Sequence, residues 1–505
     1  MGWTRRWIII AFWVVVACLG LPYWIWTTSI HRSHLPLGMM NSWAEGKACQ
    51  MSYPLHIRLS APDLGEQAGS LLAEGVMRRM NELTDLQLYT FKLSYNDSLP
   101  TSTERDWDLL VLLSEEQNTN PEASLRSWAP VLDVRYDPNS DTNTLATFIS
   151  QEVRTVFEYE HESLTYLLND TPYATGKDTT SSLEGKTRLD ARTTRAFKYA
   201  SMYHLTFSLF TSSASPSSWD VDEALNKYIT PLLQPLSKIS KFTINTQVQL
   251  HASFSPSIAG PMHDATSGKW LLQKTDLSGF VNAAEWPLSP SIGAGPTINF
   301  VLYVPSVEQS PLEIAETGGT SWLVPQWGGV QILNPSDMQS ATLSAGDLEQ
   351  VMLTFADHLT ALVGLPPSPQ SLALRLSSLT RERATSLILS ASSTLGALAR
   401  LTLKLTSISI PDSVAKSVDE TIARLDQACL DLREGRFDSA LSNARIANDE
   451  AERAFFEPSM VGQVYFPDEH KVAVYVPLLG PMAVPLVMAA LKELRKLRAA
   501  KLKSA

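Results

Sequence analysis

Two uncharged apolar stretches, one near each end of the chain, constrain its fold more than any other feature. The first, WIIIAFWVVVACLGLPYWIW, spans residues 7–26. At a rise of about 1.5 Å per residue, a helix of this length crosses the roughly 30 Å hydrocarbon core of a bilayer. Tryptophans stand near both of its ends, and Arg5 and Arg6 precede it. Because flanking basic residues stay in the cytosol, we predict a transmembrane helix behind a cytosolic N-terminus of residues 1–6. A signal peptide cleaved near residues 27–29 is the alternative.

The second stretch covers residues 472–491, and residues 492–505 after it carry six basic side chains. This basic tail predicts a second transmembrane helix that returns the chain to the cytosol. Pro477, Pro481 and Pro485 lie four residues apart on one helical face. Each removes a backbone donor, so we expect a neighbouring helix at this face. The alternatives are a buried helix of a soluble protein and a GPI-attachment signal, but a GPI signal would end in its apolar tail.

The charge of the middle of the chain restricts its partners. The chain has 505 residues, of which 44% are apolar and 18% charged, enough to bury a sizeable core. Without the basic ends, 33 Lys and Arg face 51 Asp and Glu, a formal charge of −18. An acidic body disfavours nucleic acid, because binding needs cations that displace the counterions of phosphate.

Cysteines and glycosylation signals bear on the compartment. Cys18 lies inside the first span, so Cys49 and Cys429 are the possible luminal pair, and whether they pair is open. Asn96 and Asn169 begin Asn-x-Ser/Thr triplets. Both fall in the predicted luminal body, so we predict that they are glycosylated.

Hydrophobic periodicity predicts an α/β luminal domain over residues 27–365, with a mixed sheet flanked by helices. No repeat is visible at residue level, but strand, helix, strand recurs. Residues 171–195 are polar and predict a long loop, residues 31–49 a short connector, and residues 267–286 a short helix between loops. Strands are expected at residues 55–59, 86–95, 107–113, 130–136, 199–210, 242–250, 297–305 and 311–314, and helices at residues 62–83, 145–168 and 221–239.

The most distinctive stretch is SWLVPQWGGVQILNP, residues 321–335. Gly328 and Gly329 follow Trp327 and suit a turn that needs a positive φ, before a strand at residues 330–333. A hairpin corner held by a buried Trp is favoured over a ligand site.

From residue 343 onward the pattern is helical. Apolar residues at spacings of three and four predict helices at residues 343–365, 372–405, 414–434 and 437–456. We expect residues 366–471 to form a luminal helical bundle or stalk that leads to the second span.

Catalytic motifs are missing from the sequence. Cys49 and Cys429 lie in no recognisable nucleophile setting, and no Gly-x-Ser-x-Gly elbow occurs. His31 and His34 lack a nearby cluster of further ligands, so a solvated connector is favoured over a metal site. The sequence therefore nominates no active site, no metal and no cofactor.

The order of these features resembles one known family. One span near each terminus, a large acidic luminal body, INFVLYVP, then PLEI, then WLVPQWGGVQILN and a helical close are similar to the PIG-S family, a subunit of the GPI transamidase of the endoplasmic reticulum. Pro325, Trp327, Gly328 and Gly329 match the Pro-x-Trp-Gly-Gly corner of that family.

The resemblance implies a non-catalytic subunit in the endoplasmic reticulum membrane, with both termini cytosolic. Its partners would be a PIG-K-like cysteine protease, which supplies the thiol nucleophile, and multi-spanning membrane subunits. A membrane-tethered luminal hydrolase or glycan-processing enzyme that uses dispersed carboxylates is the alternative, and a free-standing luminal receptor is a third.

Overall fold

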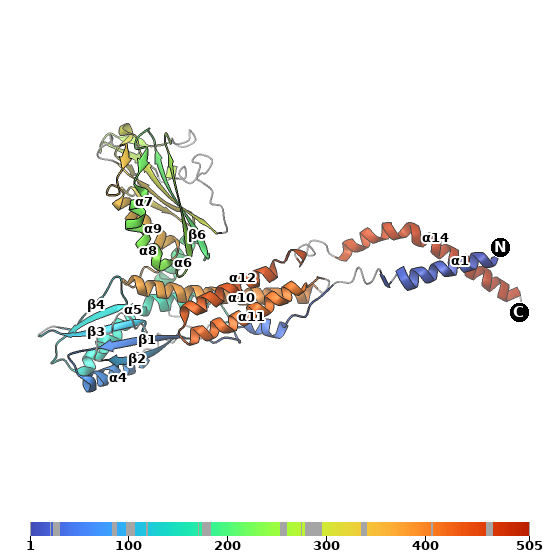
Figure 1. The fold of residues 1–505 in the computed structure, drawn as a ribbon, viewed down its shortest axis with the longest axis horizontal. Helices are drawn as coiled ribbons and strands as arrows, with labels where there is room; N and C mark the ends of the chain where they lie inside the picture. The colour runs from blue at the N-terminus through green and yellow to red at the C-terminus, as the bar shows by residue number, and fades with distance from the viewer. Residues whose placement is uncertain are drawn as a thin grey trace. The chain divides into compact units, whose positions relative to one another are not determined.

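The computed structural model describes residues 2–503, except residues 21, 24–30, 83–87, 97–106, 118–119, 170, 174–182, 253–259, 274, 278–294, 335–340, 406–407 and 461–467. The chain divides into two compact units. The larger unit holds Gln50–Ser386 and Ala428–Ser442, and the smaller holds Met1–Cys49, Leu387–Gln427 and Asn443–Ala505. Figure 1 shows the elements of both units, coloured along the chain.

The larger unit begins with a five-stranded sheet in the order β2-β1-β3-β5-β4. Neighbouring strands are parallel except β4, which runs antiparallel to β5. Two helices follow β1 and β5, and they pack on each other. The apolar run of β3 is buried at Leu109, Leu110 and Val111, as a strand covered on both faces requires. The elements are β1 (Tyr53–Ser60), α4 (Glu66–Glu82), β2 (Tyr89–Asn96), β3 (Leu109–Glu115), β4 (Glu122–Leu125), β5 (Val131–Tyr136) and α5 (Thr142–Asn169).

A second five-stranded sheet repeats this topology. Its order, β8-β6-β11-β14-β13, places its strands in the same succession and directions, again with an antiparallel pair at one edge. The duplication is architectural, without a repeat at residue level, as the recurring pattern indicated. The elements are β6 (Met202–Thr211), α7 (Val221–Ala224), η3 (Leu225–Ile229), α8 (Thr230–Leu236), β8 (Lys241–Gln249), β11 (Thr297–Val304), β13 (Ser321–Val324), β14 (Gly328–Ile332) and α9 (Glu349–Leu362).

Two predictions for this region are wrong. The expected loop at residues 171–195 contains a helix, α6 (Leu183–Arg195), whose buried face includes the charged Arg192 and therefore lacks an apolar stripe. Residues 269–272 of the expected short helix form a strand, β10 (Lys269–Leu272), that joins β9 (Met262–Asp264) and β12 (Leu312–Ile314) in a small sheet. Residues 278–286 of that prediction lie outside the described residues.

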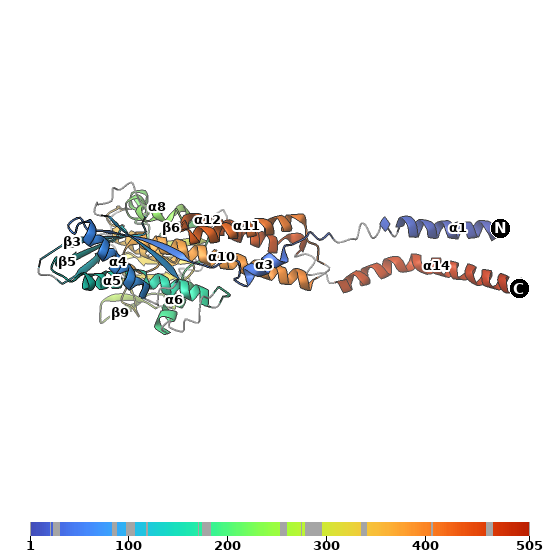
Figure 2. The ribbon, with the colours of Figure 1, turned by 90° about the horizontal axis from the view of Figure 1, so that it is seen from below.

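The predicted C-terminal helices are confirmed as α10 (Leu372–Lys404), α11 (Asp412–Arg433) and α12 (Phe437–Phe455). They lie side by side in Figures 1 and 2. The predicted connector at residues 31–49 contains a short helix, although His31 and His34 are exposed as expected. In the smaller unit, α3 (Leu37–Ala44) buries Trp43, and the Arg32 guanidinium donates to the Thr402 and Leu405 carbonyls at 3.0 and 3.1 Å.

Both predicted terminal spans are helical where the structure describes them, in α1 (Gly2–Val15) with η1 (Val16–Gly20), and in α14 (Asp468–Lys503). Within the described residues, however, α10 is the one helix long and apolar enough to cross a membrane, and half of its apolar stretch is buried inside the protein. A core helix gives the same signal. Membrane crossing at the two ends therefore stays a prediction.

Candidate functional site

Open α/β sheets bind ligands at the carboxyl ends of their strands, where the strand order reverses. In the second sheet this point lies between β6 and β11, where Ser212 N–H donates to the Val304 carbonyl at 3.1 Å. In the first sheet it lies between β1 and β3, and the 3.1 Å hydrogen bond from the Tyr136 hydroxyl to the Glu115 carboxylate lies beside it, between β3 and β5. In the part of the chain that the structure describes, no three His, Cys, Asp or Glu side chains could hold a metal ion together.

The cysteines have a structural state that the sequence left open. Cys49 and Cys429 are both disulfide-bonded, and Cys18 is a free thiol. Because a thiolate is the nucleophilic form of cysteine, neither disulfide-bonded residue can act as a nucleophile in this state.

The two predicted glycosylation sites lie at the ends of secondary structures. Asn96 is the last residue of β2, and Asn169 is the last residue of α5. Both are half-buried. Asp97, Ser98 and Asp170 of the two triplets lie outside the described residues, and glycosylation stays a prediction.

The predicted hairpin corner joins β13 to β14, but its positive φ falls at another residue. Trp327 N–H donates to the Val324 carbonyl at 3.2 Å, and Gln326 has a φ of 53°. Pro325 then stands at the second position of the turn and the positive φ at the third, as in a type II turn. Gln326 donates from its N–H to the Arg195 carbonyl and from Nε2 to the Thr194 carbonyl, both at 3.1 Å. These bonds satisfy the C-terminus of α6 and hold Gln326 in its uncommon conformation.

The two glycines after the turn serve close packing within β14. A Cβ on Gly328 would collide with the backbone carbonyl of Asn299 on β11, and a Cβ on Gly329 would meet the His358 ring on α9. Trp327 is half-buried and packs against the apolar cluster beneath the sheet. The expectation of a positive φ at the glycines is therefore wrong, whereas the hairpin corner itself is confirmed.

The packing of His358 predicts a pH effect. Burial holds the pKa of His358 below its usual value of 6.5, against the opposing charge of Asp357. The unfolded chain therefore takes up a proton that the folded state resists, and stability should fall as the pH drops below 6.5 and stay level above it. Denaturation midpoints at pH 7.5 and 5.5 measure this. His358→Gln should reduce the difference, and His263→Gln, at an exposed position, should not; an unchanged difference in His358→Gln would refute the assignment.

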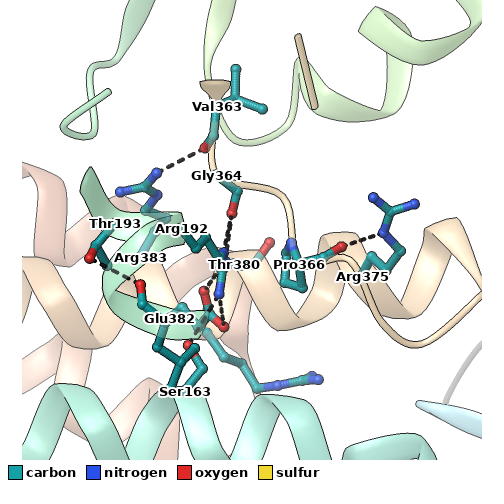
Figure 3. A network of polar contacts seen from close by, with 12 residues as sticks. Ser163, Arg192, Thr193, Val363, Gly364, Pro366, Arg375, Thr380, Glu382 and Arg383 are labelled. Atoms are coloured by element: carbon teal, nitrogen blue, oxygen red, sulfur yellow. Dashed lines mark hydrogen bonds and ion pairs between the residues drawn. The ribbon is translucent and has the colours of Figure 1, made fainter. Parts of the chain in front are cut away.

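A buried polar network joins four segments of the larger unit (Figure 3). Arg192 of α6 reaches the Glu382 carboxylate of α10 at 2.6 Å, the Gly364 carbonyl at 2.5 Å and the Ser163 hydroxyl of α5 at 3.2 Å. Burial alone would lower the pKa of Arg192, but the Glu382 carboxylate raises it, so the guanidinium stays charged. Both side chains are more than nine-tenths buried. The attraction between the two charges offsets the free-energy cost of removing them from water.

Neighbouring arginines complete this network. The Arg383 guanidinium donates to the Val363 carbonyl at 2.9 Å, and Arg375 Nε to the Pro366 carbonyl at 2.5 Å. Together with Arg192 they satisfy three carbonyls in the last turn of α9 and the loop after it, a position that favours cations. The sequence suggested no such role, because apolar periodicity does not identify buried arginines.

A second buried pair lies further along the same helices. Arg381 is fully buried and pairs with Glu160 of α5 through Nε at 2.5 Å and through a terminal nitrogen at 2.8 Å. The Asp108 carboxylate lies 3.8 Å from its other terminal nitrogen, and the Phe437 ring stacks on the guanidinium at 4.9 Å.

Above Phe437 the larger unit has a half-open cavity of about 660 Å³. Its size falls within the range of about 300–1,000 Å³ found for small-molecule sites. The cavity lies at the amino ends of strands of the first sheet, because Trp107 and Asp108 directly precede β3 and Pro130 precedes β5. Residues of α8, α10 and the loop between α11 and α12 complete the wall.

Hydrogen bonds hold one side of the cavity in place. Leu372 N–H donates to the Ser127 carbonyl at 2.7 Å, and the Ser371 hydroxyl to the Ala129 carbonyl at 2.9 Å. These bonds anchor the loop that carries Trp128 to the start of α10. Trp128 is 70% exposed, although the backbone on both sides of it is fixed by these bonds.

Other parts of the wall are fixed through buried or half-buried carboxylates. His56 N–H donates to Asp108 at 2.8 Å. The buried Asp431 accepts bonds from Arg436 Nε at 3.0 Å and from the Ser439 hydroxyl at 2.6 Å, which hold the loop between α11 and α12. The cavity is thus preformed, yet sequence reasoning missed it, because its walls come from loops far apart in the chain. A tryptophan in the polar segment before Pro130 was the one local signal.

A protein-family model and several known proteins match most of the chain. The family model described as "Phosphatidylinositol-glycan biosynthesis class S protein" matches residues 11–500. The chain is 27% identical over 504 residues to the "GPI transamidase component PIG-S homolog" of Schizosaccharomyces pombe, covering 97% of this chain and 84% of the relative. It is 26% identical over 509 residues to the "GPI transamidase component GPI17" of Saccharomyces cerevisiae, covering 95% and 90%.

A mammalian relative matches over a shorter region. The "GPI-anchor transamidase component PIGS" of Bos taurus is 32% identical over 326 residues, which cover 59% of this chain and 58% of the relative. The chain therefore spans less than two thirds of the length of this relative.

Proposed function

Because the chain belongs to the PIG-S family, we propose that it is a non-catalytic subunit of a GPI transamidase, which attaches GPI anchors to proteins in the lumen of the endoplasmic reticulum. The single observation that carries the proposal is the match of the family model to residues 11–500. In this role the subunit supports assembly of the complex or admission of substrate proteins.

The assignment of chemistry to a partner has support in the described residues. Cys49 and Cys429 are held in disulfide form, so neither sulfur is available as a thiolate nucleophile in this state. The reacting thiol would belong to a PIG-K-like cysteine protease, and multi-spanning subunits would complete the complex. The alternative, a membrane-tethered luminal hydrolase or glycan-processing enzyme, would need its carboxylates gathered in one place.

The proposed topology places both termini in the cytosol and the bulk of the chain in the lumen. Residues 7–26 and 472–491 would cross the membrane, with residues 27–365 and 366–471 between them. The disulfide-bonded state of Cys49 and Cys429 fits an oxidising compartment. Glycosylation at Asn96 and Asn169 and protection of the body from protease in sealed microsomes would test this placement.

Purification of the tagged full-length chain in mild detergent tests the function. We expect a PIG-K-like protease to come with it, whereas an enzyme acting alone would come out without partners. Depletion of the chain should lower the amount of GPI-anchored proteins at the cell surface. Unchanged surface levels would favour the free-standing receptor instead.

A paired cysteine substitution separates a structural from a catalytic role. We expect Cys49→Ser with Cys429→Ser to retain anchor attachment wherever the complex still assembles, because neither sulfur takes part in the reaction. The measurement is attachment of an anchor to a reporter protein, normalised to the amount of assembled complex. Loss of attachment in a fully assembled complex would contradict the non-catalytic assignment.

A further inference from the structure

The cavity of the larger unit has the chemistry of a site for an uncharged, hydroxyl-rich ligand. Its charged wall residues are Asp108, Lys238, Arg436 and Asp438, whose formal charges cancel. Arg436 is already paired with the buried Asp431 at 2.5 Å, and Asp108 lies 3.8 Å from the buried Arg381. The charges that remain, on Lys238 and Asp438, also cancel. A phosphate or another strongly charged group would find no matching excess of charge, so the balance favours a neutral ligand.

Aromatic rings supply the apolar part of the wall. Trp107, Trp128 and Phe437 line the cavity, and the Trp128 ring is 70% exposed on a loop fixed by two hydrogen bonds. An exposed, rigidly held indole ring offers a flat apolar face at little cost in conformational entropy. Sugar rings present such flat faces of C–H groups, surrounded by hydroxyls that need polar partners.

Polar groups for those hydroxyls stand around the same rings. The Asp438 carboxylate is exposed at the start of α12, and the Ser377 and Ser439 side chains lie on the wall nearby. Asp108 already accepts the His56 N–H at 2.8 Å, which fixes its orientation without exhausting its lone pairs. A rigid mixture of aromatic and polar groups lowers the entropy cost of binding.

The walls are less suited to an extended polypeptide. The residues of the cavity wall lie in helices and loops, and none of them belongs to a strand. The cavity therefore offers no free strand edge for the ladder of backbone bonds that holds an added strand.

We propose that this cavity binds a neutral oligosaccharide, with the Trp128 ring stacked on a sugar face and Asp438 accepting hydroxyl hydrogen bonds. Two sources offer this chemistry: the neutral sugar residues of the anchor glycan and the glycans of substrate glycoproteins. The choice between these sources rests on the proposed function, whereas the cavity and its binding chemistry do not.

Titration of the full-length chain in detergent tests the proposal. The probes are α-linked mannotriose, N,N′-diacetylchitobiose and, as a charged control, inositol 1-phosphate, followed by calorimetry and tryptophan fluorescence. At least one neutral probe should bind, and inositol 1-phosphate should not. Trp128→Ala should weaken binding about two- to tenfold, from the contribution of one aromatic contact. Asp438→Asn should weaken it about tenfold or more, from the loss of charge-assisted hydrogen bonds.

Phe456→Ala is the matched control, because that ring is 65% exposed and is not part of the cavity wall. It should leave binding unchanged. Delipidated anchor glycan and an oligomannose glycan released from glycoprotein then separate the two sources. Absence of binding by every neutral probe would overturn the proposal, as would equal binding by the wild-type chain and both cavity variants.

The result is distinguishable from failure of the proposed function. Trp128→Ala should still co-purify with the transamidase subunits, since the ring is proposed to contact a sugar rather than a protein. Loss of those subunits in Trp128→Ala would identify the cavity as a protein interface and overturn the oligosaccharide proposal. Absence of the subunits from the wild-type preparation would instead refute the proposed function.

Discussion

Replacement of Glu160 by Gln should destabilise the larger unit by about 3–5 kcal/mol. The substitution keeps the shape of the side chain but leaves the fully buried Arg381 without its full counter-charge. Burial alone would lower the pKa of Arg381, but the Glu160 carboxylate, through its charge and its hydrogen bonds, together with Asp108 raises it, so Arg381 remains protonated. The remaining Asp108 lies 3.8 Å away and is too distant for a hydrogen bond. Urea denaturation of the full-length chain, followed by tryptophan fluorescence, measures the loss.

Two further variants serve as a control and as a test of the ion pair. Glu158→Gln, at an exposed position on the same helix, should change stability by less than about 0.5 kcal/mol. Glu160→Leu combined with Arg381→Met should recover part of the loss, because replacing both charges removes the unpaired ion. A loss in Glu160→Gln no larger than in Glu158→Gln would show that the pair contributes nothing to stability.

Replacement of Gly328 by Ala should cost about 3 kcal/mol or more, at the upper end of the range for overpacking. The added Cβ would collide with the Asn299 carbonyl of β11, and that carbonyl cannot move without disturbing the centre of the second sheet. The cost should appear as a lower denaturation midpoint and as faster hydrogen exchange in β11 and β14.

Two other glycines near the same hairpin serve as controls. Gly329→Ala should cost less than Gly328→Ala, because its new Cβ meets the His358 side chain, which can rotate. Gly319→Ala should stay within about 0.5 kcal/mol, since the nearest atom to its Cβ is the Thr317 hydroxyl at an ordinary 3.5 Å. Equal losses at all three positions would contradict the close approach of β14 to β11.

Periodicity predicted most of the regular elements, because a strand or helix with one buried face repeats its apolar residues at a fixed spacing. The strand around Leu109 and the long helix from Leu372 to Lys404 were both found in this way. The helix α6 was missed because its buried face is anchored by Arg192, a residue that periodicity counts as solvent-exposed. The short strand β4 was missed because its Glu122–Leu125 sequence has no continuous apolar face.

The hairpin corner is a second case in which the local sequence predicted an element but not its detailed conformation. The sequence indicated a tight corner at Trp327 and Gly328, and the corner exists. Which residue would adopt the positive φ depended on the carbonyls of Thr194 and Arg195, which hold Gln326 in place from another helix. The residues next to Gln326 in the sequence give no indication of this contact, because Thr194 and Arg195 lie far away in the chain.

The amino-acid sequence by itself determined most of the succession of strands and helices, the acidic body and the likeness to a family, because each depends on residues close together in the chain. Only the tertiary structure decided which distant residues come together: Arg192 pairs with Glu382 and Arg381 with Glu160, and Trp128 and Asp438 line one cavity. The physical reason is that local spacing reports how each segment faces the core, whereas a charge pair or a cavity forms between segments, after their packing has fixed which surfaces touch.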